Sequence, residues 1–225
     1  MEFEEICDTT ELPEALPILP VRDAVIFPYM TIPLQIAREI SMQALERALK
    51  DRRMLLLLSQ KNARQDDPGP EDLYEIGTVC MIVRMLKEDD GRMKVLVQGL
   101  AKARVREILF EEPHLFCKID SIQEPMLTSI PIEVEALMRS VRDTLDDFLG
   151  TKNLPNEILM LTENINDPGV LADLIAANLN LRVPDAQRLL ECTDPVHRLE
   201  KVGEELHREI ELTRMQTRIQ SQAKE

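Results

Sequence analysis

The 225-residue sequence predicts an α+β protein, a twisted β lobe followed by an all-α lobe. Short apolar runs broken by proline and glycine fill the first half, whereas apolar residues at helical spacing fill the second half. The pattern changes at Gln123-Glu124-Pro125. We therefore predict a flexible acidic tail (1–14), a β lobe with one inserted helix (15–123) and a helical lobe that ends in a long helix (124–225).

The β lobe opens with Leu16–Ile36, LPILPVRDAVIFPYMTIPLQI. Proline is excluded from helix interiors because its ring removes a backbone donor and clashes with the preceding turn. This segment should be extended, with a strand over Met30–Ile36. Its prolines should lie at strand edges, bends or strand starts: Pro17, Pro20, Pro28 and Pro33.

One helix and one buried strand follow. Apolar residues recur at helical spacing over Arg38–Asp51, which predicts an amphipathic helix. Met54–Leu58 is a continuous apolar run of strand length and should be buried on both faces. The next stretch, NARQDDPGPED, is a loop because proline and glycine stand among polar residues.

Two antiparallel strand pairs complete the lobe. Gly77–Leu86 and Arg92–Val97 flank a turn in which Asp90 and Gly91 should supply the left-handed positions. Alternation predicts one face with Met81, Val83 and Met85, and a second, solvent-facing side with Ile82, Arg84 and Leu86. Ala101–Phe110 and Leu115–Ile122 form the second pair around Glu111-Glu112-Pro113. This pattern favours a small twisted barrel or folded sheet over a βαβ architecture.

Helices account for the second half. We expect them at Ile132–Leu149, Pro155–Leu161, Gly169–Asn180, Pro184–Cys192 and from Pro195 onward. Asp167-Pro168 and Asp194-Pro195 match an N-cap followed by a proline at the first helical position. The last ten residues are polar and favour helix without a stop signal, so we expect a longer parent chain.

Composition excludes several classes of function. The net charge of −14 opposes nucleic-acid binding and docking on anionic membranes. No apolar run approaches the ~20 residues that span a bilayer, and the acidic start does not resemble a signal peptide, which predicts a cytoplasmic protein. The four cysteines are scattered, so disulfides are not expected.

The search for catalytic chemistry is negative. The seven glycines do not build a phosphate-binding loop, and no serine stands in a nucleophile motif. His114 and Cys117 lack a second ligand pair, so a partly exposed histidine beside a buried thiol is the better interpretation. His197 and His207 lie too far apart on one helix to share a ligand and should be solvated. We predict no catalytic, cofactor-binding or metal-binding residue.

Contact with other proteins remains as the predicted activity. Apolar segments interrupted by proline suit recognition of an extended, unfolded polypeptide. One candidate cluster is Phe27, Tyr29, Met30 and Ile32, and a second is Met81, Met85 and Met93, since methionine adapts to varied partners. At strand spacing the same residues also fit an ordinary core.

The sequence resembles the N-terminal region of the bacterial Lon protease family. The resemblance is carried by PVRD, FPYMTIPL, LLLLSQ, DPGPEDLYEIGTV, DGRMKVLVQGL and AKARV, in the order of the family, and more loosely by the helical half. It implies a PUA-like β lobe, a helical lobe and a long helix leading to the ATPase of a homo-hexameric ring. ATP, Mg and the Ser-Lys dyad would belong to domains that this chain lacks.

What the resemblance implies for function is recognition of unfolded, damaged or degron-bearing proteins in protein quality control. A stand-alone Lon-like interaction or assembly module without protease activity is the alternative. A PUA-like fold also suggests RNA binding, but the acidic charge and the scarcity of aromatic residues oppose it.

Overall fold

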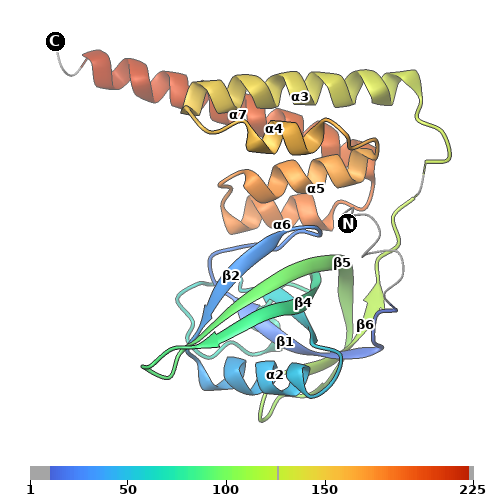
Figure 1. Cartoon of the computed structure of the whole chain (residues 1–225), viewed down its shortest axis with the longest axis vertical. Coiled ribbons are helices and arrows are strands. Elements are labelled where there is room, and N and C mark those ends of the chain that lie inside the picture. Colours follow the sequence, from blue (N-terminus) through green and yellow to red (C-terminus); the bar gives the residue numbers. More distant parts are fainter. Residues whose placement is uncertain (1–10, 126, 223–225) are drawn as a thin grey trace. The chain divides into compact units, whose positions relative to one another are not determined.

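The computed structural model describes residues 11–125 and 127–222, and within these ranges it contains a mixed six-stranded sheet and six α-helices (Figure 1). The predicted α+β class is confirmed. The strands are β1 (Ala15–Val21), β2 (Thr31–Ile36), β3 (Met54–Ser59), β4 (Ile76–Lys87), β5 (Met93–Phe110) and β6 (Phe116–Ser121). The helices are α2 (Glu39–Leu49), α3 (Ile132–Lys152), α4 (Glu157–Thr162), α5 (Pro168–Asn178), α6 (Val183–Glu191) and α7 (Pro195–Gln222). A short 3-10 helix, η1 (Pro70–Asp72), lies in the predicted loop.

The sheet closes on itself. Its strand order is β2-β5-β4-β3-β1-β6, and β6 also pairs with β5. β5 therefore closes a five-stranded barrel, while β2 adds to it as an outer strand. The β1–β3 pair is parallel and the other pairs are antiparallel. Sequence reasoning predicted two strands over 92–110, but the structure has one strand of 18 residues.

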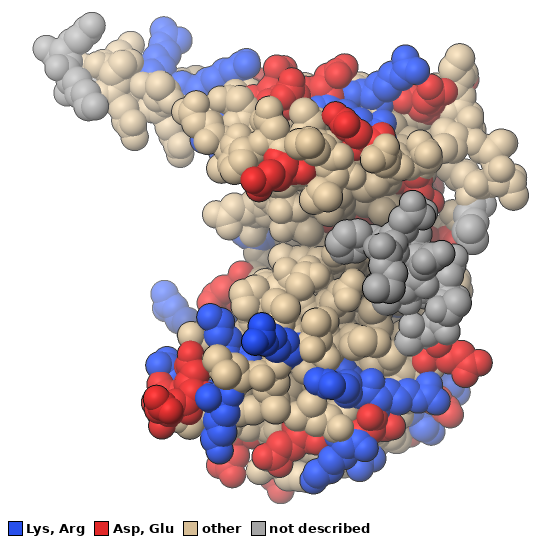
Figure 2. Space-filling model, viewed as in Figure 1, with Lys and Arg blue, Asp and Glu red and all other residues tan. Residues whose placement is uncertain are grey.

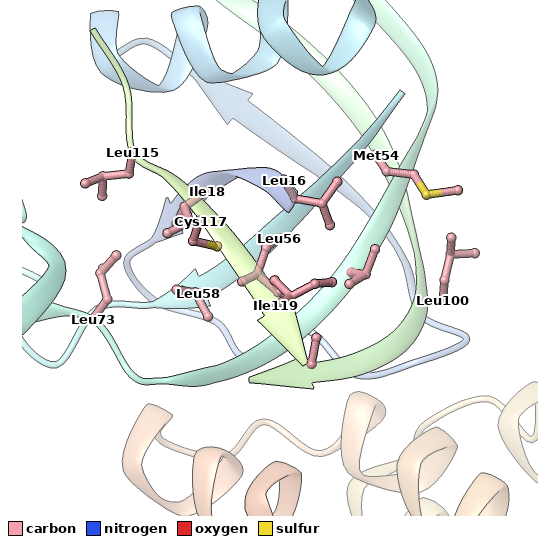
Figure 3. Close-up of a cluster of buried hydrophobic side chains, with 12 residues drawn as sticks. Leu16, Ile18, Met54, Leu56, Leu58, Leu73, Leu100, Leu115, Cys117 and Ile119 are labelled. Atoms are coloured by element: carbon pink, nitrogen blue, oxygen red, sulfur yellow. The ribbon is translucent and has the colours of Figure 1, made fainter. Parts of the chain in front are cut away.

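Two apolar clusters fill this unit. The first lies inside the barrel, where Figure 3 shows Leu56 and Leu58 of β3 among side chains from neighbouring strands. The second lies on the opposite face of the sheet and includes residues of α2. As predicted, β3 is buried along its whole length, because its alternate side chains enter the two clusters.

Two glycines permit close backbone approach in the barrel. A Cβ at Gly99 would collide with the carbonyl of Phe27, and one at Gly77 would collide with the carbonyl of Leu57. At the β4–β5 turn Gly91 is left-handed, with φ of 87°. Asp90 is not left-handed, so that part of the prediction was wrong; its carboxylate instead accepts a hydrogen bond from the backbone of Arg92 (3.1 Å).

Pro33 lies on an edge strand, as predicted. The carbonyl of Met30 accepts a hydrogen bond from Gly99 N (2.8 Å). Because hydrogen-bonded pairs alternate along an antiparallel ladder, the backbone groups of Thr31, Pro33 and Gln35 point to the outer edge of β2. Pro33 has no N–H, so the middle of this edge offers no donor.

A β-bulge between Ile82 and Arg84 reverses the alternation of β4, so the side chains after it point to the opposite face from the one that simple alternation predicts. Ile82 is buried in the second cluster, and Met85 lies opposite Val95 on that same face. Met81 packs on the first cluster instead. The predicted grouping of Met81 with Met85, and of Ile82 with the solvent side, was therefore wrong because alternation fails at a bulge.

The chain forms two compact units by its internal contacts. One comprises the described residues up to Gln123 together with Leu181–Glu191, and the other comprises Glu124–Asn180 and the described residues from Cys192. Helix α6, which sequence reasoning assigned to the helical lobe, is thus grouped with the strands. The Gln187 side chain of α6 donates to the carbonyl of Ile76 (2.9 Å).

The helical unit is organised around α7. Helices α3 and α5 pack against it, and a Cβ at Gly203 would lie 3.3 Å from Val141 Cγ2. The predicted caps are present: the carboxylates of Asp167 and Asp194 accept from the backbone N–H groups of Val170 (2.8 Å) and His197 (2.9 Å). Apolar side chains of the distal half of α7 are exposed, namely Leu212, Met215 and Ile219.

Arg198 of α7 is fully buried in this unit. Its guanidinium contacts the carboxylates of Glu124 (2.7 Å) and Asp173 (2.9 Å). It also donates to the carbonyl of Cys192 (2.6 Å). Burial alone would lower the pKa of Arg198, but the two carboxylates raise it above its usual value, so the group is a buried cation.

Candidate functional site

Across the described ranges, no three His, Cys, Asp or Glu residues come close enough to hold a metal ion. In the same ranges, no helix has the length and apolar character needed to cross a membrane. Burial raises the pKa of the Cys117 thiol to about 12, which keeps it protonated and unreactive.

His114 was predicted to be partly exposed, but only 6% of its surface is accessible. Its ring packs edge-on against Phe110 (5.3 Å between centroids), and Phe110 stacks on Phe116 (4.9 Å). Neither ring nitrogen of His114 has a hydrogen-bond partner. Burial, together with the positive charge of Arg47, lowers the pKa of His114. This side chain therefore belongs to an aromatic cluster.

The first predicted binding cluster is largely part of the core. Phe27 is almost fully buried. Met30 and Ile32 are half-buried and pack on the second apolar cluster. Tyr29 is half-buried in a left-handed conformation with φ of 66°. These residues are neighbours, but Phe27 offers no accessible surface to a partner.

The second predicted cluster is divided by the sheet. Met85 and Met93 lie on the face of the second apolar cluster, and Met81 lies on the other face. Met93 and Met81 are half-buried, while Met85 is exposed. The structure therefore groups Met85 and Met93 with Met30 and Ile32, and separates Met81 from them.

Beyond the bulge, β4 carries an exposed apolar surface. Val83, Met85 and Leu86, called the hairpin surface below, are 48%, 38% and 62% exposed. Both faces of β4 are open here, because the strand extends past the residues that the core covers. Acidic side chains gather at the β4–β5 turn, whose backbone Figure 1 shows and whose side chains include the red group at the left of Figure 2. Several exposed apolar residues at one end of a strand are typical of an interaction site.

A row of side chains leads from the hairpin surface to a cleft. Met85 pairs with Val95, which is fully buried, and Val95 pairs with Leu34 of β2, so only the two ends of the row are accessible. Strand spacing makes this row about 10 Å long. Leu34 also lines a cleft of about 470 Å³. Its other lining residues belong to β1, the following loop, the end of β2 and the start of α2: Leu19–Ala24, Gln35–Arg38 and Ser41.

Two arginines dominate the charge of the cleft. Arg38 donates to the carbonyl of Pro20 (2.8 Å) and to Gln60 Oε1 (2.8 Å). Arg22 pairs with the carboxylate of Asp66 (2.7 Å). Burial and the neighbouring charge of Arg22 lower the pKa of Arg38. Both arginines therefore hold positive charge where apolar side chains also line the wall.

Sequence reasoning did not select the cleft. Arg22 lies in the PVRD motif, and Arg38 and Ser41 lie in the helix predicted over Arg38–Asp51. A conspicuous signal was the charged RD pair directly after an apolar strand, at a point where polar side chains often reach a site.

Comparison with known proteins places these observations in a family. The family model described as "ATP-dependent protease La (LON) substrate-binding domain" matches residues 15–208. A Lon protease of Geobacter metallireducens is 49% identical over 216 residues, which are 96% of this chain and 26% of the relative. A Lon protease of Desulfovibrio desulfuricans is 49% identical over 215 residues, 95% of this chain and 24% of the relative. The chain thus spans about a quarter of these relatives.

Solved structures show the same fold. The N-terminal domain of Mycobacterium avium complex Lon protease matches with a TM-score of 0.70 at 22% identity, covering 86% of this chain and 98% of that one. A Lon N-terminal domain protein from Xanthomonas campestris matches with a TM-score of 0.60 at 16% identity, covering 84% and 96%.

Proposed function

This chain belongs to the family of Lon substrate-binding domains, and we propose that it captures unfolded or degron-bearing protein segments for a Lon-like ATP-dependent serine protease. In this proposal the chain itself is non-catalytic and supports a homo-hexamer in the cytoplasm. ATP and Mg act in a separate ATPase domain. Protein substrates, and neither nucleic acid nor membrane, are the partners.

The hairpin surface is the observation that carries the proposal. Val83, Met85 and Leu86 lie within four consecutive residues and are exposed on a strand that is anchored in the barrel, with Met85 and Leu86 on opposite faces of it. Burying one large apolar side chain contributes about 1.5–3 kcal/mol, and such burial does not require a fixed sequence in the bound segment. This tolerance suits unfolded proteins, which share exposed apolar residues but no common sequence.

Side-chain contact is favoured over strand addition at β2. The outer edge of β2 lacks its central donor at Pro33, which interrupts the ladder that an added strand would need. Capture should therefore depend on apolar side chains and change little with salt, since charge screening does not weaken apolar burial.

The test is binding of the 225-residue chain to one protein in its folded form and in a permanently unfolded form, at low and high salt. We expect selective, salt-tolerant binding of the unfolded form. Leu86→Gln should weaken this binding about tenfold, as the loss of a buried leucine contact predicts. Leu161→Gln is a matched control on α4, because Leu161 is similarly exposed (56%).

Equal weakening by both substitutions would show that the hairpin surface is not the capture site. If the chain binds neither form, the alternative of an assembly module without substrate capture is favoured.

A further inference from the structure

We propose that the cleft at the start of α2 is a carboxylate subsite, which holds an acidic group of the peptide whose apolar part lies on the hairpin surface. This inference deepens the proposed function and rests on it. The carboxylate is either the free C-terminus of the peptide or an acidic side chain within it.

The start of α2 is the first reason. Arg38 is the N-cap of this 11-residue helix, and its guanidinium, which only donates hydrogen bonds, does not cap the N–H groups of the first turn. The first turn of a helix leaves N–H groups without intrahelical partners and carries partial positive charge. Arg38 and Ser41, which stand in this turn, both line the cleft. A helix terminus of this kind favours anionic groups.

Ser41 is the second and independent reason. Only 3% of its surface is accessible, and its hydroxyl has no hydrogen-bond partner in the described structure. A buried hydroxyl without a partner is unfavourable, and most such groups find one. A carboxylate oxygen that enters the cleft would accept from this hydroxyl, which gives the Ser41 side chain the partner it lacks.

The charged residues that line the cleft favour an anionic ligand. Arg22 and Arg38 line the cleft together with a single acid, Asp23. Arg22 already binds a carboxylate, that of Asp66, whose side chain is 89% exposed. Such an exposed pair contributes little to stability, so a ligand carboxylate can share or replace it at small cost.

The apolar residues of the cleft define the rest of the ligand. Leu19, Val21, Leu34 and Ile36 line it, and Leu34 is the end of the row that starts at Met85. Met85 and Leu34 are about 10 Å apart, on either side of the fully buried Val95, and an extended peptide spans this distance with about three residues. The preferred ligand is therefore an extended peptide with an apolar residue about three positions before a carboxylate.

Three labelled peptides with one common apolar sequence test the proposal on the 225-residue chain. The first has a free C-terminal carboxylate, the second a C-terminal amide, and the third a C-terminal amide with an aspartate about three positions after the apolar residue. We expect the amide peptide to bind more weakly than at least one of the others. The first and third peptides distinguish the C-terminal from the side-chain source.

Ser41→Ala should weaken binding of the carboxylate peptide about fivefold, the usual effect of one lost hydrogen bond, and leave binding of the amide peptide unchanged. Arg22→Gln should weaken the carboxylate peptide and reduce the salt dependence of its binding. Ser140→Ala and Arg139→Gln make the same chemical changes at exposed positions on α3 and serve as controls. Because the Ser41 hydroxyl has no partner, Ser41→Ala should melt at the same temperature as the parent or higher.

Equal binding of all three peptides would overturn the carboxylate subsite while leaving apolar capture intact. A carboxylate preference that survives Ser41→Ala and Arg22→Gln would also overturn it, since the preference would then arise elsewhere. If none of the peptides binds, both this inference and the proposed function fail.

Discussion

The two units of this protein are stabilised in different ways. The barrel unit is filled by two clusters of aliphatic side chains and thiols, and its strands approach closely at Gly77 and Gly99. The helical unit places a buried cation, Arg198, between two carboxylates and two backbone carbonyls. An apolar core loses only part of its stability when one contact is removed, whereas a buried ion network depends on every partner being present.

Arg198→Met should have the largest effect. It leaves Asp173 and Glu124 without their cation, and breaking a buried pair in this way costs about 3–5 kcal/mol. Urea unfolding followed by circular dichroism measures the loss. Arg139→Met, which removes an exposed pair with Glu135, should cost less than about 1 kcal/mol. If the two substitutions lower the free energy of unfolding equally, the helical unit does not depend on its buried cation.

Gly99→Ala tests the barrel unit. The new methyl group would collide with the Phe27 carbonyl, and overpacking of this kind costs about 1–3 kcal/mol. Gly150→Ala is the control, because nothing lies within 4 Å of its Cβ position on α3. Alanine there should stabilise by about 0.5–1 kcal/mol. Opposite signs for the two variants in thermal unfolding would confirm that close backbone approach constrains the barrel.

Substitution of His114 should have the smallest effect on stability, and this effect should depend on pH. Its pKa is lowered in the folded state, so the unfolded state binds the proton more tightly. The free energy of unfolding therefore decreases as the pH falls below the pKa of histidine in the unfolded state, which is about 6.5. His114→Phe should remove this part of the pH dependence, so its advantage over the parent grows between about pH 7 and about pH 5. A constant difference across that range would contradict the assignment.

Local signals predicted much of the fold. Asp167 and Asp194 set helix starts, Pro33 marked the edge strand, and the apolar run at Met54 marked a buried strand. These features depend on residues close in sequence, where steric and hydrogen-bonding rules act directly.

Features that depend on distant pairing were missed. The bulge near Val83 is a feature of the pairing between β4 and β5, which alternation along one strand does not reveal. The grouping of α6 with the strands depends on Gln187 reaching Ile76. The cleft joins Arg22 of the loop after β1 with Arg38 and Ser41 at the start of α2, so no local pattern distinguishes it.

The unbroken course of β5 has a mechanical consequence. One strand of 18 residues, with a contour length of about 60 Å, pairs with β2 and β4 near the hairpin surface and with β6 where the barrel closes. A pulling force applied along this strand would load many ladder hydrogen bonds in parallel rather than open them one at a time. A segment held at the hairpin could then be drawn away under tension while the barrel that holds it stays folded.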